Sequence, residues 1–100
     1  MNIKIHSVKF DADEKLLSFI EDKVNKLDQF YDGIIGTEVF LRLEKDTSGR
    51  ENKIVEVKLD VAGKPLFSKR QCKTFEEATD QSVDAIRKQL IKRKEKIRSI

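Results

Sequence analysis

Regularly spaced basic side chains near the C-terminus are the clearest chemical feature of this sequence. One set is Lys88, Lys92 and Lys96, and a second set is Arg87, Lys94 and Arg98. Because an α-helix advances 100° per residue, each set predicts a ridge of cations along one helical flank. Such ridges suit phosphate contacts, which position a protein on a nucleic acid without reading its bases.

The charge of the whole chain is only +3, but it is unevenly distributed. Residues 74–84 contain four acids and no base, whereas residues 85–98 contain seven bases and only Glu95 as an acid. This order of signs complements a helix dipole, yet the dipole effect fades within the terminal turn and does not require seven bases. We therefore interpret the basic end as a polyanion-binding surface, with a solvated helix end as the alternative. The candidate binding residues are Lys23, Lys26, Arg87, Lys88, Lys92, Arg93, Lys94, Lys96 and Arg98.

Residues for catalysis or metal binding are scarce. His6 and Cys72 are the only conventional Cys–His pair, and both fall in predicted strands that the sequence does not place together. We interpret His6 as an ordinary strand residue and Cys72 as a small apolar one. One His and one Cys exclude multi-histidine or cysteine-rich metal sites and an internal disulfide. We therefore expect no catalytic residue, metal, cofactor or small-molecule substrate.

The length of 100 residues and mass of 11.6 kDa predict a single domain over 1–100. No run approaches the roughly 18 apolar residues of a membrane span, and the N-terminus lacks a signal-peptide pattern. A single cysteine fits a reducing compartment, so we expect a cytoplasmic protein without membrane contact.

Hydrophobic periodicity predicts four strands and two helices. Alternating apolar residues favour strands within 2–10, 39–43, 55–61 and 66–73, with turns at 46–49 and 63–65 and a loop at 34–37. Asp11 and Glu14 resemble a capping box for the first helix, which we expect to end at Asp32 and Gly33. Thr74 and Glu77 resemble a second capping box, which opens a helix to the C-terminus.

Each helix carries one apolar stripe. The first stripe is Leu16, Ile20, Val24, Leu27 and Tyr31, and the second is Phe75, Ser82, Ile86, Leu90 and Ile97, with Thr79 and the stem of Arg93 along it. The predicted fold class is α+β: a two-layer sandwich of order β-α-β-β-β-α. A four-stranded antiparallel sheet would be open to water on one face and covered by both helices on the other.

The chain resembles the bacterial ribosome hibernation-promoting factors and the related ribosome-associated translation inhibitor, over essentially its whole length. Residues 2–3, 14–32, 39–45 and 84–94 carry the resemblance. The last segment, D-A-I-R-K-Q-L-I-K-R-K, is similar to the family's closing D-K-L-x-R-Q-L-x-K-x-K. Departures include Ala85 in place of the family lysine after Asp, and Leu17 where an arginine is common.

This resemblance implies a ribosome hibernation factor that binds ribosomal RNA of the small subunit in the channel of mRNA and tRNA. It implies competition with both of these RNAs and a block of translation in stationary or stressed cells. Residue by residue, it assigns RNA contacts to Lys23 and Lys26 of the first helix and to Lys88, Lys92 and Lys94 of the second.

Three alternatives remain open from the residues themselves. The open sheet face, with Phe40, Ile54 and Phe67, suits a protein-interaction module. A general structured-RNA-binding domain would use the same basic ridges. A small acid/base or thiol enzyme would have to use His6 and Cys72.

Overall fold

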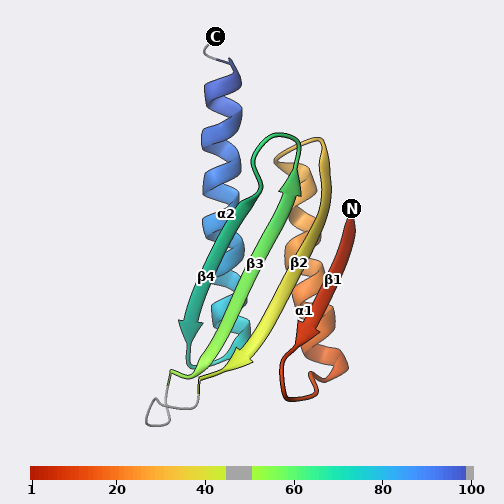
Figure 1. Cartoon of the computed structure of the whole chain (residues 1–100), viewed down its shortest axis with the longest axis vertical. Coiled ribbons are helices and arrows are strands. Elements are labelled where there is room, and N and C mark those ends of the chain that lie inside the picture. The colour runs from red at the N-terminus through yellow and green to blue at the C-terminus, as the bar shows by residue number, and fades with distance from the viewer. Residues whose placement is uncertain (45–50, 99–100) are drawn as a thin grey trace.

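The alternating apolar segments form one sheet, and the two apolar stripes form helices that cover it (Figure 1). The structure is a computed structural model. It describes residues 1–44 and 51–98, and for residues 97 and 98 it describes the backbone only. The elements are β1 (Asn2–Ser7), α1 (Glu14–Asn25), the 3₁₀ turn η1 (Lys26–Gln29), β2 (Ile34–Leu43), β3 (Lys53–Val61), β4 (Leu66–Cys72) and α2 (Phe75–Arg98). The α+β class, the element order and the two layers are confirmed. The turn predicted at 46–49 lies outside the described residues.

The sheet order is β1-β2-β3-β4, and the expectation of a fully antiparallel sheet was wrong for β1. Strands β2, β3 and β4 pair antiparallel, whereas β1 runs parallel to β2, with Ile3 opposite Thr37 and Ile5 opposite Val39. A parallel pair needs a crossover of a dozen or more residues, and the segment containing α1 supplies it. Both helices therefore lie behind the sheet in Figure 1, on one face.

The core lies between this face and the helices. Its fully buried members include Ile20, Val24 and Leu27 from the first helical segment, Val39, Leu41, Val55, Val57 and Leu59 from the sheet, and Ile86 and Leu90 from α2. These are the residues that the two periodicities place on the inner faces. Burial of this apolar surface is the main force that joins the layers.

The first helix begins later than expected. The cap is Asp13, whose Oδ1 accepts a hydrogen bond from the Leu16 N–H at 2.8 Å. Asp11 was therefore the wrong capping residue. The helix also ends earlier, at Asn25, and continues as η1 before Gly33, at a φ of +100°, leads into β2.

The segment 34–37, expected as a loop, is the beginning of β2. The register shifts between Ile34 and Gly36, which leaves Ile34 buried and Ile35 61% exposed. A Cβ at Gly36 would lie 3.1 Å from the Asn2 carbonyl oxygen, so a glycine permits the close approach of β1.

The predicted turn at 63–65 and the cap of α2 are both confirmed. Gly63 has a φ of +96° between β3 and β4, a conformation that suits glycine. The Thr74 hydroxyl accepts a hydrogen bond from the Glu77 N–H at 3.0 Å.

Helix α2 is fixed to the sheet through its first half and extends past it at its C-terminal end (Figure 1). The Ser68 hydroxyl donates to the Ser82 carbonyl at 2.9 Å, and the Ser82 hydroxyl donates to the Val55 carbonyl at 3.1 Å. With 24 residues the helix is about 36 Å long, whereas the seven residues of β4 span about 23 Å. The last turns of α2 therefore project beyond the β3–β4 hairpin.

The Asp13 cap gives a direct test of the helix boundary. Asp13→Ala removes the acceptor of an exposed helix-start N–H and should lower the free energy of unfolding by about 1 kcal/mol in urea titrations. Asp11→Ala is the matched control, with an expected change within about 0.5 kcal/mol. A larger loss for Asp11→Ala than for Asp13→Ala would contradict this boundary.

Candidate nucleic-acid interface

The structure divides the predicted binding residues into those engaged within the molecule and those that point outward. Lys23 belongs to the first group: its Nζ lies 3.1 Å from Asp80 Oδ1, so this ion pair joins α1 to α2. Its Nζ also lies 5.4 Å from the centre of the Phe19 ring. Lys26, in η1, is exposed.

Arg87 and Lys88 share one carboxylate on their own helix. Arg87 Nη2 lies 2.7 Å from Asp84 Oδ1, and Lys88 Nζ lies 3.1 Å from Asp84 Oδ2. The Arg87 guanidinium also lies 5.7 Å from the centre of the Phe30 ring, beside the end of the first helical segment. Hydrogen bonds from Arg87 and then Lys88 hold the pKa of Asp84 below its usual value. Arg87 is thus largely committed to the fold, whereas Lys88 keeps 68% of its side chain exposed.

The later cations lie on the projecting end of α2. Lys92, Lys94 and Lys96 are exposed, and the described residues supply neither Lys92 nor Lys94 with an ion-pair partner. Arg93 is half-buried, and its Nη1 is shielded from solvent without a hydrogen-bond partner in the described part of the chain. Arg98 is the last residue of α2, and its side chain lies outside the described residues.

One cation that the sequence analysis did not include joins this surface. Arg70 of β4 lines the same hollow as Lys88 and Gln89 of α2. Residues 70 and 88 have no local spacing relation, because only the packing of α2 along the edge strand brings them together. The sequence therefore contained no signal for this pair.

The open face of the sheet does not form the apolar patch considered above. Ile54 is only 5% exposed, and Phe40 stacks on His6 with ring centres 4.8 Å apart. Of the three residues predicted for the patch, only Phe67 is well exposed, at 53%. The Arg42 guanidinium, paired with Glu56 at 3.3 Å, further surrounds Phe40 with charge.

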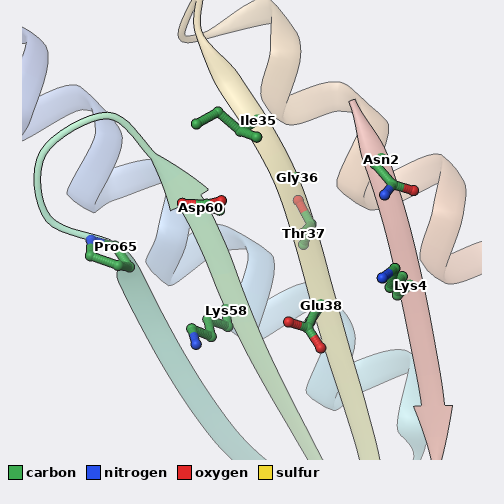
Figure 2. A pocket seen from close by; sticks show the side chains of 9 residues that line it. All are labelled: Asn2, Lys4, Ile35, Gly36, Thr37, Glu38, Lys58, Asp60 and Pro65. Atoms are coloured by element: carbon green, nitrogen blue, oxygen red, sulfur yellow. The ribbon is translucent and has the colours of Figure 1, made fainter.

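A hollow of about 330 Å³ lies on this open face, across β1, β2 and β3 (Figure 2). Its charged members are Lys4, Glu38, Lys58 and Asp60, and Figure 2 shows them alternating across neighbouring strands. Two cations beside two carboxylates give no net attraction for a polyanion. The strongly basic surface of the described residues therefore lies on α2 and not on the sheet.

His6 and Cys72 are not brought together. His6 is exposed on β1 and lies 3.2 Å from Glu38, whereas Cys72 is buried on β4, the opposite edge strand of the sheet. Burial raises the pKa of the Cys72 thiol, which disfavours the reactive thiolate. The described residues contain no group of three His, Cys, Asp or Glu side chains placed to hold a metal ion.

Neither helix, over the residues described, is long and apolar enough to cross a membrane.

Comparison with known proteins places residues 3–98 in the family described as Sigma 54 modulation protein / S30EA ribosomal protein. A ribosome hibernation promoting factor from Azotobacter vinelandii is 27% identical over 96 residues, which cover 96% of this chain and 85% of that protein. A ribosome hibernation promoting factor from Klebsiella oxytoca is 29% identical over 98 residues, which cover 98% and 96% of the two chains.

Solved structures agree on the fold. The N-terminal domain of Thermus thermophilus Protein Y matches with a TM-score of 0.79 at 24% identity, over 92% of this chain and 98% of that one. A ribosomal subunit interface protein from Coxiella burnetii matches with a TM-score of 0.83 at 19% identity, over 94% and 98%. Both confirm the two-layer architecture over nearly the full length.

The Asp84 ion pairs predict a specific titration. Because the pKa of Asp84 in the fold lies below its value in the unfolded chain, the pairs stabilise the fold at pH above the unfolded value, and this stability is lost as pH falls through the folded pKa. In NMR titrations, Arg87→Gln should raise the Asp84 midpoint, while Lys94→Gln, further along the same helix, should leave it unchanged. An Asp84 midpoint that does not respond to Arg87→Gln would contradict the assignment.

Proposed function

Because the chain belongs to the Sigma 54 modulation protein / S30EA ribosomal protein family, we propose that it binds the small ribosomal subunit in the channel of mRNA and tRNA. There it blocks translation in stationary or stressed cells. This family contains ribosome hibernation factors, which regulate translation and are not enzymes. Ribosomal RNA is the proposed partner, without a cofactor or small-molecule substrate.

The projecting basic end of α2 is the observation that carries this proposal. Lys88, Lys92 and Lys96 recur at one-turn intervals, and Lys94 lies on the same exposed end. Two turns of helix span about 11 Å, so the ridge reaches more than one phosphate of an RNA backbone. No aromatic residue lies between residues 76 and 98, which favours backbone contacts over base stacking.

The rest of the molecule supplies the steric block. The fold measures 48 × 24 × 18 Å and consists of one two-layer body. When α2 holds the ribosomal RNA backbone, the sheet and α1 occupy the adjoining volume and exclude mRNA and tRNA. The whole chain, residues 1–100, acts in this account as one ribosome-binding domain, in the cytoplasm where ribosomes translate.

Charge reversal on the ridge tests the proposal. The triple variant Lys88→Glu, Lys92→Glu, Lys96→Glu should lose co-sedimentation with small subunits, with affinity at least 100-fold lower. Loss of three phosphate contacts should also reduce the slope of log affinity against log salt by about 2 to 3.

The matched control is Lys4→Glu, Lys58→Glu, Lys64→Glu, which changes the charge equally at exposed positions on the sheet face and the β3–β4 hairpin. It should bind like the wild type. Circular dichroism checks that both variants fold. A folded ridge variant that sediments with small subunits like the wild type would contradict the proposed surface.

A further inference from the structure

We propose that a strand of RNA backbone lies in a groove between α2 and the edge strand β4, where Arg70 and Arg93 bind its phosphates. This inference rests on the proposed function and names where the RNA is held. It adds a strand residue, Arg70, to a surface that the sequence places on helices alone. It also places the ridge residues Lys88, Lys92 and Lys96 along the same groove as Arg70 and Arg93.

The groove consists of two hollows in series. The first, of about 440 Å³, is lined by Arg70, Gln81, Asp84, Ala85, Lys88 and Gln89. The second, of about 790 Å³, is lined by Leu66, Gln89, Lys92, Arg93, Glu95 and Lys96. Gln89 lines both hollows, so they adjoin along one face of α2, with Arg70 of β4 beside the first and Leu66 of β4 beside the second. We name the two hollows together the α2–β4 groove. Figure 1 shows α2 beside β4, the edge strand that supplies Arg70 and Leu66.

The length of the groove suits several nucleotides. From Gln81 to Lys96 the helix rises about 22 Å. A stacked nucleic-acid strand carries one phosphate per about 3.4 Å along its axis, so several consecutive phosphates fall within this length. The groove contains no aromatic side chain, and its ligand is therefore the backbone and not a stacked base.

The charge of the groove favours an anion. Five cations line it (Arg70, Lys88, Lys92, Arg93 and Lys96), against the two carboxylates Asp84 and Glu95. Asp84 lies in the half nearer the start of α2 and is already paired with Arg87 and Lys88. The opposite flank of α2 differs, because Lys23 there is paired with Asp80, and Arg87 lies against Phe30.

Arg93 is the groove residue that carries an unsatisfied hydrogen-bond donor. Its Nη1 is shielded from solvent and finds no hydrogen-bond partner among the described residues. A buried polar group without a partner destabilises the fold, and a phosphate oxygen in the groove would satisfy it. Rotation of the guanidinium toward the groove breaks no protein hydrogen bond at this atom. The planar fork of arginine also matches a phosphate with two parallel hydrogen bonds.

Arg70 faces the groove from the other wall. Its Nη1 donates to the Lys69 carbonyl at 2.8 Å, which fixes one end of the guanidinium on the exposed edge of β4. A guanidinium has five N–H donors, so other donors remain for a phosphate. Gln89 donates to the Phe67 carbonyl at 3.0 Å and ties the floor of the groove to the same edge. Arg70 and Gln89 are therefore held in place before RNA arrives, which lowers the entropy that these two side chains lose on binding.

Paired neutralisation tests the groove. In binding to purified small subunits across a salt series, Arg70→Gln with Arg93→Gln should weaken affinity at least tenfold. The slope of log affinity against log salt should fall by about 1.4 to 1.8, because two phosphate contacts are lost. Lys4→Gln with Lys58→Gln removes the same charge from the open sheet face and should stay within twofold of the wild type.

Two further variants distinguish the loss of phosphate contacts from unfolding and from the loss of charge alone. Arg70 is exposed on a strand edge, so Arg70→Gln alone should preserve the fold and still reduce the slope by about 0.7 to 0.9. Arg93→Lys retains the charge but loses the fork, and should bind more weakly than the wild type. If the groove variants bind like the sheet-face control, the inference is wrong although the proposed function stands. If the wild type itself fails to bind small subunits, the proposed function fails, and this inference fails with it.

Discussion

The packing of α2 against the inner face of β3 and β4 is the interaction on which the rest of the structure depends. Ile86 and Leu90 are fully buried there, and the hydroxyls of Ser68 and Ser82 connect helix and sheet through buried hydrogen bonds. Because these contacts fix α2 as far as Leu90, its last two turns leave the body of the protein in one direction. A short strand and a long helix thus produce a basic projection.

The acidic residues of α2 determine which of the nearby cations can bind a polyanion. Asp80 holds Lys23 of α1, and Asp84 holds Arg87 and Lys88, so the first half of the helix neutralises nearby bases. Beyond Asp84, Glu95 is the only acid before the end of the helix. The acids at the start of α2 and the bases at its end complement the helix dipole. The same order of charges means that the start of α2 pairs with other parts of the fold, whereas its end is suited to bind a polyanion.

The sequence predicted the layers, the element order and most of the core, because period-2 and period-3.6 patterns directly reflect burial. The Asp84 pairs were not predicted, although their spacing of three and four residues, which brings side chains together on a helix, was an available signal. The sequence did not predict the parallel pairing of β1, because the alternating pattern of this half-buried edge strand is equally typical of antiparallel sheets. The helix between the first two predicted strands was the available signal, since it is the crossover that a parallel pair needs. Nor did the sequence distinguish Asp13 from Asp11 as the cap, because both residue types suit a helix start. It did not place Arg70 beside Lys88, since that contact depends on how distant segments pack.

A cryo-electron microscopy reconstruction of this protein bound to the small ribosomal subunit would show directly where it binds and which of its surfaces contacts ribosomal RNA. The account predicts density for the fold in the channel of mRNA and tRNA, with the projecting end of α2 and its β4-facing side against ribosomal RNA. Density at another site, or in the channel with the open sheet face on the RNA and the end of α2 in solvent, would contradict it.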